Sequence, residues 1–289
     1  MISANTKVYG IVGNPISHSL SPLLQNALAK EMNIDMKYVA FHVNENIKEA
    51  IKGAFFLGIQ GFNVTIPFKK DMLEIVSEID DRAKNIGAIN TLIRVANGYK
   101  GYNTDILGLG MSLENNRFNI KDKNIILLGA GGAAKAALYL AIEKSAKSIT
   151  IINRNKKKAD ELRAEVDFSD ISTISLEELK ADINLLEYDN YFVFQTTNVG
   201  MHPNIEDCII DNENFYKKCE AGIDLIYTPF ETEFIKNMKK NNKDCINGLD
   251  MLILQGVASF EIWNGVKIDK DIIDKVKLLL VEELRERMQ

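Results

Sequence analysis

Three polar segments in the first part of the chain carry side chains that could bind a small polar ligand and move a proton. The segments are Gly13–Pro22, Gly61–Lys70, and Gly87–Thr91 with Gly101–Asp105. Lys69 and Asp105 suit proton transfer, because a lysine close to a carboxylate forms a plausible acid–base pair. Pro67 predicts a helix start, which would place Lys69 in a first turn where a cation opposes the helix dipole. A lysine in that position indicates a function.

Each segment also has a structural explanation. Ser21 could cap a helix that has Pro22 as its first residue. Asp105 could start the following helix, because its charge suits the positive end of the dipole. All three segments nevertheless lie at ends of predicted strands, where open α/β sheets bind their ligands. Together they form a candidate substrate site.

A glycine loop later in the chain is a candidate dinucleotide site. The predicted strand Ile125–Leu128 runs into Gly129, Ala130, Gly131, Gly132 and Ala133, and a helix rich in small residues follows. Such a loop lets the backbone approach a pyrophosphate, whose charge the helix N-terminus then stabilises. Ala134 stands where the strict motif has its third glycine, so a tight turn without a ligand is the alternative.

The next predicted strand ends at the point that selects between NAD and NADP. NAD-binding folds place an acidic residue there for the ribose 2′-hydroxyl, whereas this chain has Asn153, Arg154 and Asn155. A guanidinium is suited to a 2′-phosphate. The lysines at 156–158 either add positive potential or form an ordinary solvated helix start. The sequence therefore predicts NADP(H).

Short apolar runs alternate with amphipathic stretches, which is the pattern of βαβ units and a mainly parallel sheet. Strands are predicted at 8–12, 38–43, 61–65, 125–128, 148–152, 191–196, 221–227 and 243–246, with a hairpin at 89–102. Helices are predicted from 21, at 47–57, from 67, from the glycine loop to about 142, and at 157–166, 251–263 and 270–287. Because the pattern restarts near Asn124, two domains are expected.

Composition excludes several classes of protein. A chain of 289 residues with 26% charged residues and a net charge of −5 fits a globular protein and argues against nucleic acid binding. The three cysteines and three histidines show no disulfide or metal-ligand spacing, so no metal is expected. The chain shows no signal peptide and no apolar run of membrane-spanning length, which predicts a cytoplasmic protein without a membrane partner.

From Tyr9 to about Gly265 the chain closely resembles the shikimate/quinate dehydrogenase family. The matching motifs, in family order, are S-x-S-P at 19–22, N-V-T-x-P-F-K at 63–69, G-A-I-N-T at 87–91, N-T-D at 103–105, G-A-G-G-A at 129–133, N-R-N at 153–155 and G-L-x-M-L-x-x-Q at 248–255. The combination is far more specific than any one of these motifs.

The resemblance implies a role for each matching residue. Lys69 and Asp105 would be the catalytic pair. The substrate residues would be Ser19 and Ser21 for a carboxylate, Thr65, Asn90 and Gln255 for ring hydroxyls, and Asn63 and Tyr227 lining the same pocket. The cofactor residues would be Gly129, Ala130, Gly131, Gly132, Ala133, Asn153, Arg154, Asn155 and Gly248.

The family fold implies two α/β domains with a cleft between them. Residues 1–103 and 248–289 would form a mainly parallel substrate domain completed by the C-terminal helices, and residues 104–247 a Rossmann-type NADP-binding domain. The implied activity is the NADPH-dependent, reversible reduction of 3-dehydroshikimate to shikimate in chorismate and aromatic amino acid biosynthesis. The implied partner is this small molecule, bound by a monomer or homodimer.

Departures from the family pattern leave alternatives open. Ile106 replaces the glycine that usually follows N-T-D, Asp250 alters the late motif, and Gln195 precedes Thr196 where N-A-T/S is commoner. None of these removes a catalytic group, although each could tune the substrate preference. A quinate/shikimate dehydrogenase using NAD is one alternative, and a non-catalytic sensor of a shikimate-pathway ligand is another.

Overall fold

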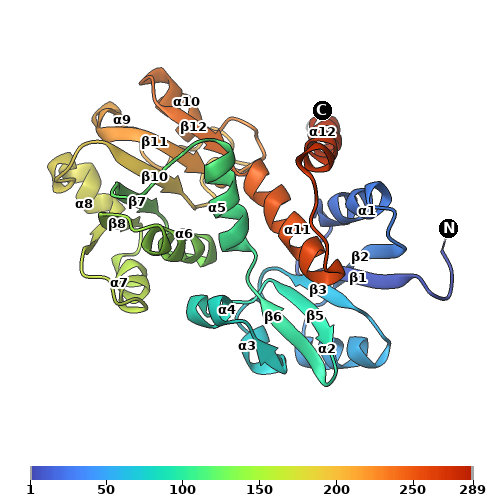
Figure 1. The fold of residues 1–289 in the computed structure, drawn as a ribbon. Helices are drawn as coiled ribbons and strands as arrows, with labels where there is room; N and C mark the ends of the chain where they lie inside the picture. The colour runs from blue at the N-terminus through green and yellow to red at the C-terminus, as the bar shows by residue number, and fades with distance from the viewer. Residues whose placement is uncertain (1, 288–289) are drawn as a thin grey trace. The chain divides into compact units, whose positions relative to one another are not determined.

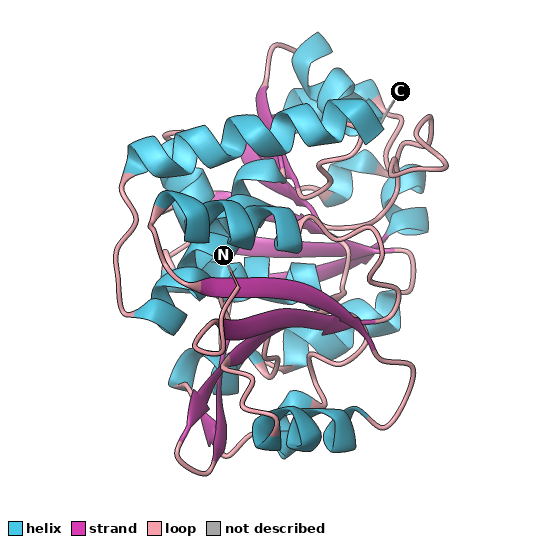
Figure 2. Cartoon of the chain, turned by 90° about the vertical axis from the view of Figure 1, so that its right-hand side faces the viewer, coloured by secondary structure: helices cyan, strands magenta, loops and turns pink. Residues whose placement is uncertain are grey.

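The computed structural model describes residues 2–287, which form two α/β units. Unit 1 contains the described residues up to Gly108 and those from Ile253 onward, and unit 2 is Leu109–Leu252 (Figure 1). The divisions fall inside helices α5 (Asp105–Asn115) and α11 (Leu249–Asn264), a few residues after the positions expected from the sequence. The predicted α/β fold class is confirmed, because each unit has one sheet with helices packed against it (Figure 2).

The sheet of unit 1 has the strand order β2-β1-β3-β5-β6-β4. Its strands are β1 (Lys7–Gly13), β2 (Met36–His42), β3 (Gly61–Val64), β4 (Glu78–Ile79), β5 (Thr91–Val95) and β6 (Gly98–Tyr102). Strand β1 is parallel to β2 and β3, whereas β5 is antiparallel to both β3 and β6. The predicted hairpin is therefore present, and it turns the sheet from parallel to mixed.

Helices cover the sheet of unit 1 and bury its apolar side chains. They are α1 (Ser21–Glu31), α2 (Ile47–Phe56), α3 (Met72–Ile75), α4 (Asp81–Ile86) and α12 (Lys270–Arg287), together with the first turn of α5 and most of α11. Phe62 of β3 and Leu92 of β5 lie in the core, which Ile51 of α2 and Ala83 of α4 also reach.

The prediction that a helix begins at Pro67 is wrong. Residues 66–71 form turns, and only the single turn of α3 follows them. The carbonyl of Lys69 accepts the amide of Ile89 at 2.8 Å, so the segment bonds to a distant part of the chain instead of to its own next turn. Lys69 therefore does not lie in the first turn of a helix, and its charge does not oppose a helix dipole.

Ser21 does not cap helix α1, contrary to the structural alternative considered for it. The helix begins at Ser21 itself, the N-cap residue is Leu20, and no side chain caps the first turn. Ser21 is instead buried, and its side chain lies close to that of Tyr38 on β2. Because the Ser21 hydroxyl is not used as a helix cap, it could serve another role.

Unit 2 contains a fully parallel sheet with the order β12-β11-β10-β7-β8-β9. Its strands are β7 (Asn124–Leu128), β8 (Ser148–Asn153), β9 (Ile171–Ser175), β10 (Tyr191–Gln195), β11 (Cys219–Asp224) and β12 (Asp244–Asn247). Renumbered within the unit, this is the order 3-2-1-4-5-6 of dinucleotide-binding sheets, whose switch point lies between β7 and β10. The continuous burial of Ile125–Leu128 is that of a strand covered on both faces.

The helices of unit 2 follow the strands in alternation. They are α6 (Gly132–Glu143), α7 (Lys156–Ala164), α8 (Leu176–Ala181), the short 3₁₀ helix η1 (Ile183–Leu185), α9 (Glu213–Lys218) and α10 (Glu233–Lys240). The strand predicted at 221–227 ends earlier, at Asp224, because the Asp224 carboxylate accepts the amide of Ile226 at 3.0 Å.

Within residues 2–287, no cluster of three or more His, Cys, Asp or Glu side chains is arranged to hold a metal ion. Cys208, Cys219 and Cys245 are free thiols. No helix in the same range combines the length and apolar character needed to cross a membrane.

Candidate functional site

Strand register gathers the polar residues of unit 1 at one edge of its sheet. Thr65 follows β3 directly, and β5 starts at the same edge because it runs antiparallel to β3, with Asn63 opposite Thr91. Strand β6 returns to that edge, since Thr91 is also opposite Tyr102, and Asn103 follows. Segments that are far apart in the sequence therefore deliver side chains to one place.

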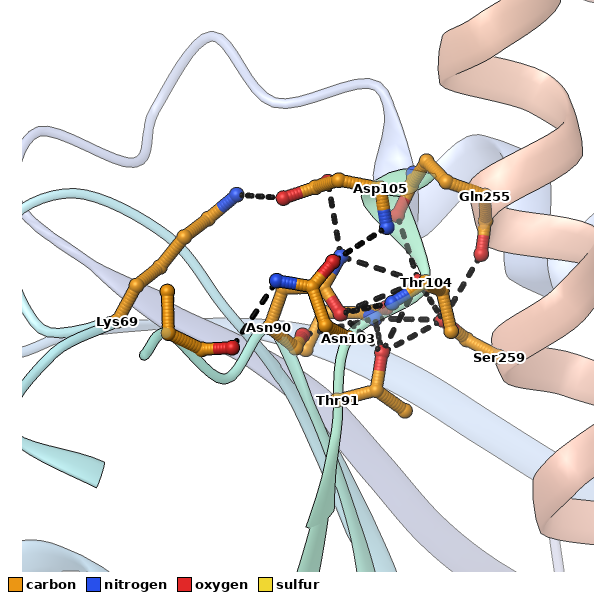
Figure 3. A network of polar contacts seen from close by, with 10 residues as sticks. Lys69, Asn90, Thr91, Asn103, Thr104, Asp105, Gln255 and Ser259 are labelled. Atoms are coloured by element: carbon orange, nitrogen blue, oxygen red, sulfur yellow. Dashed lines mark hydrogen bonds and ion pairs between the residues drawn. The ribbon is translucent and has the colours of Figure 1, made fainter. Parts of the chain in front are cut away.

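Lys69 and Asp105 form an ion pair at this edge. The Lys69 Nζ lies 2.6 Å from the Asp105 Oδ2, and the two side chains are 30% and 19% exposed. The other carboxylate oxygen, Oδ1, accepts the Nδ2 amide of Asn90 at 2.9 Å (Figure 3). The arrangement leaves a partly exposed ammonium group and a carboxylate with fixed orientation, which are the parts of a proton-transfer pair.

Beneath this pair lies a buried network of hydroxyl and amide groups (Figure 3). Asn63 donates through Nδ2 to Thr91 at 3.1 Å and to Ser259 at 2.9 Å, and its Oδ1 accepts the Tyr38 hydroxyl at 2.7 Å. Both amide hydrogens of Asn63 are thus used inside the protein. Asn63 therefore supports the site from below, and direct contact with a substrate stays a prediction.

Helix α11 contributes one polar stripe to the network. Gln255, Ser259 and Trp263 are four residues apart and share a helix face. Ser259 is fully buried, and the Trp263 indole donates to the carbonyl of Leu92 at 2.8 Å. The sequence reading identified Gln255 but missed Ser259, although a serine four residues after it in an apolar helix was a usable signal.

Ser19 and Ser21 lie together in the segment after β1. The Ser21 amide donates to the Ser19 hydroxyl at 3.2 Å, and Ser19 is half-buried. Thr65 is also half-buried, and its amide donates to the carbonyl of Val12 at 3.0 Å. A side chain on Gly13 would collide with Thr65, so glycine is required for this close approach.

The glycine loop of unit 2 lies at the carboxyl end of β7, beside the switch point of the sheet. Gly129 has φ +115°, and an added Cβ would lie 2.6 Å from the Thr196 hydroxyl, so only glycine fits. Added Cβ atoms on Gly131 and Gly132 would meet open space. No side chain caps helix α6, whose first amides therefore face the loop without a capping partner. These features fit a pyrophosphate.

Arg154 is exposed immediately after β8. In the described part of the chain it makes no hydrogen bond or ion pair, whereas Lys156 is bound to Glu178 at 2.7 Å. This ion pair and the capping of α8 together lower the pKa of Glu178 to about 2. Lys156 is thus committed to the protein, whereas Arg154 is available for a ligand.

Two further predicted residues lie after β11 and β12. A side chain on Gly248 would collide with the carbonyl of Leu225, and its amide donates to Ile226 at 3.0 Å, so this glycine has a packing role whatever it binds. Tyr227 lies in the loop that follows Asp224. Its contact with substrate stays a prediction.

Asp224 is fully buried and anchors the Tyr227 loop. Its carboxylate accepts the Thr232 hydroxyl at 2.5 Å, and desolvation raises its pKa to about 7. The ordinary pKa of this carboxyl group is 3.8, so between pH 3.8 and about 7 the folded state keeps a proton on Asp224 that the unfolded chain has released. This contribution to stability is complete below pH 4 and is lost as pH rises through 7.

We expect the Asp224→Asn variant to remove this pH dependence, because the amide stays neutral. The wild type should lose up to roughly 4 kcal/mol more stability than the variant between pH 4 and pH 8. Denaturant unfolding across this range measures the difference. The exposed Asp211→Asn variant is the control and should follow the wild type. Parallel curves for wild type and Asp224→Asn would contradict the assignment.

Family models match the chain in three places. Residues 11–92 match the shikimate dehydrogenase substrate binding domain, residues 112–200 match shikimate / quinate 5-dehydrogenase, and residues 248–276 match the shikimate 5′-dehydrogenase C-terminal domain. The first match covers the polar segments after β1 and β3 and ends at the start of β5, and the second covers the glycine loop.

Individual relatives agree with these matches. The chain is 42% identical over 286 residues to a shikimate dehydrogenase (NADP(+)) of Methanocaldococcus jannaschii, covering 96% of this chain and 99% of the relative. A crystal structure of a shikimate dehydrogenase in complex with NADP⁺ superposes with a TM-score of 0.86 at 39% identity, covering 96% of each chain. A shikimate 5-dehydrogenase of Listeria monocytogenes, in complex with shikimate and NAD, gives 0.85 at 26% identity, covering 96% and 98%.

Proposed function

Because this chain belongs to the shikimate dehydrogenase family, we propose that it catalyses the NADPH-dependent, reversible reduction of 3-dehydroshikimate to shikimate. The observation that carries the proposal is the Lys69–Asp105 ion pair, which Asn90 orients at the ligand-binding edge of the unit 1 sheet. This reaction supplies an intermediate of chorismate and aromatic amino acid biosynthesis.

Unit 2 supplies the cofactor residues in this proposal. The backbone of Gly129–Ala133 and the start of α6 would hold the pyrophosphate, and Gly131 and Gly132 leave the space it needs. Asn153, Arg154 and Asn155 would surround the 2′-phosphate, with Gly248 keeping the backbone after β12 close to Leu225. When bound, the nicotinamide supplies the hydride for the ketone carbon.

Unit 1 supplies the proton chemistry. The Lys69 ammonium would stabilise negative charge that develops on the substrate oxygen and would take part in delivering the proton to it. Asp105 holds the ammonium group through Oδ2 at 2.6 Å, so the charge is positioned before the substrate arrives.

The remaining polar residues of unit 1 would bind parts of the substrate that do not react. Ser19 and Ser21 would bind the carboxylate, and Thr65, Asn90 and Gln255 would bind ring hydroxyls. Asn90 also orients Asp105, so this one side chain would link substrate binding to the catalytic pair. Of the two serine side chains, that of Ser19 is the more exposed, since Ser21 is buried beside Tyr38.

Replacing both serines should raise the KM for shikimate at least ~10-fold with a smaller change in kcat, since hydrogen bonds to a charged group contribute about 1.5–3 kcal/mol each. The carboxylate is remote from the reacting carbon and is bound alike in the ground and transition states. Steady-state kinetics of the Ser19→Ala/Ser21→Ala variant measure this effect, and the exposed neighbour Ser17→Ala serves as the control. An unchanged KM in a folded double variant would rule out the carboxylate assignment.

A cytoplasmic location and a monomeric or homodimeric state stay predictions from the sequence. The quinate/shikimate dehydrogenase that uses NAD is the competing activity, and Arg154, which has no partner within residues 2–287, favours NADP over it. A non-catalytic sensor would not need the Lys69–Asp105 pair, so turnover of shikimate separates it from an enzyme.

A further inference from the structure

We propose that Ser259 is a positioning residue for the catalytic pair, acting through Thr104 and Asn90. The inference rests on the proposed function, since it concerns how the same site is held in its active arrangement. Ser259 lies on α11, is fully buried, and contacts neither Lys69 nor Asp105 through any hydrogen bond of the described residues (Figure 3). It would act through an ordered set of hydrogen bonds that can be derived donor by donor.

The orientation of Asn90 is the first step. The backbone amide of Thr104 can only donate, so the Asn90 atom 2.8 Å from it must be the carbonyl oxygen Oδ1. Nδ2 then points the other way and donates to Asp105 at 2.9 Å and to the Thr104 hydroxyl at 3.0 Å. The reverse orientation would place two donors together and would turn a carbonyl oxygen toward the carboxylate.

The proton of Thr104 is the second step. Its hydroxyl already accepts from Asn90, so its own proton needs another acceptor. Ser259 Oγ lies 3.1 Å away, closer than Asn90 Oδ1 and Thr91 Oγ1 at 3.2 Å each and Gln255 Oε1 at 3.5 Å. Ser259 donates its proton to the carbonyl of Gln255 at 3.0 Å, which leaves its oxygen as an acceptor for Thr104.

The remaining groups fit one consistent assignment. Thr91 donates to Asn90 Oδ1 at 3.0 Å, and the two hydrogens of Asn63 Nδ2 go to Thr91 and Ser259. In this assignment every buried donor of the network has an acceptor, which is the condition under which such a network fixes a unique geometry. Ser259 is needed for this assignment, because its Oγ accepts hydrogen bonds from both the Thr104 hydroxyl and the Asn63 Nδ2.

Loss of the Ser259 hydroxyl would release the Thr104 proton. That proton would then turn to Asn90 Oδ1, 3.2 Å away, and compete there with Thr91. The side-chain amide of Asn90 would then have a less fixed orientation, and its Nδ2 would donate to Asp105 for a smaller fraction of the time. The expected consequence is a fall in kcat that exceeds any change in KM, because the Asn90 bond to Asp105 is weakened while the fully buried Ser259 hydroxyl itself makes no contact with substrate.

The test is steady-state kinetics of the full-length Ser259→Ala variant with shikimate and NADP. We expect kcat to fall about 3- to 10-fold, the usual size for one buried neutral hydrogen bond, and KM to change less than about 2-fold. The matched control is Ser112→Ala on α5, which removes an equally buried hydroxyl that has no hydrogen-bond partner among the described residues. Its kcat should equal that of the wild type.

Two further variants separate hydrogen bonding from packing. Ser259→Cys keeps a similar volume but is a weak acceptor, so it should lose kcat as Ser259→Ala does. In an Asn90→Ala background, Ser259→Ala should change kcat by less than about 2-fold, because the residue through which it acts is gone.

An unchanged kcat in Ser259→Ala, a full kcat in Ser259→Cys, or an undiminished effect in the Asn90→Ala background would each overturn the inference while leaving the proposed function intact. An inactive wild type would overturn both.

Discussion

Replacing Lys69 with alanine should lower kcat at least ~10²-fold with only a modest change in KM, because a charge that stabilises mainly the transition state acts on kcat. The ammonium group is held at 2.6 Å from Asp105, and both side chains are partly exposed, so its removal should leave the fold intact. Steady-state kinetics with shikimate and NADP measure the loss, and circular dichroism checks the fold.

The chain offers a matched control at the next position. Lys70 is exposed and lies in the same run of turns, so Lys70→Ala removes the same charge from the same segment without touching the pair. Its kcat should stay within about 2-fold of the wild type, in the range expected for surface substitutions. Near-wild-type turnover by Lys69→Ala would remove this lysine from the mechanism.

Replacing Arg154 with alanine should abolish most of the preference for NADP, chiefly through a higher KM for NADP. One or two charge-assisted hydrogen bonds to the 2′-phosphate, at about 1.5–3 kcal/mol each, correspond to roughly 10- to 10³-fold in discrimination. The wild type should accordingly favour NADP over NAD at least ~10-fold in kcat/KM. Kinetics with both cofactors measure the ratio for wild type and variant.

The basic residues near Arg154 serve as comparisons. Arg163→Ala removes an exposed guanidinium from the far end of α7 and should leave the ratio unchanged. Lys156 is paired with Glu178, so Lys156→Ala should have a smaller effect than Arg154→Ala. The effect of any exposed lysine should also shrink as salt is added. An unaltered cofactor ratio in Arg154→Ala would show that other residues select NADP.

The sequence grouped polar residues that the structure brings together, but it predicted their surroundings less well. Lys69, Asn90 and Asp105 were identified from residue type and motif, and the structure places Lys69 and Asn90 within hydrogen-bonding distance of Asp105. The glycine loop was also placed correctly between a buried strand and a helix, because continuous burial and small residues are visible in the sequence.

What the sequence did not predict depends on long-range contacts. The segment after Pro67 was expected to be helical, but the carbonyl of Lys69 bonds to Ile89, which no local pattern indicates. Ser21 was considered as a helix cap, and burial against Tyr38 gives it a different environment. Ser259 has a role only because α11 packs on the start of β5, as its bond to Thr91 shows.

The proposed activity of this chain is that of an NADP-dependent dehydrogenase acting on shikimate. One assay matrix tests it most directly, with shikimate and quinate each oxidised by NADP and by NAD. We expect the highest kcat/KM for shikimate with NADP, at least ~10-fold above shikimate with NAD, because NADP alone offers a 2′-phosphate to Arg154. Turnover of quinate with NAD at the highest kcat/KM, or no turnover of either substrate, would contradict it.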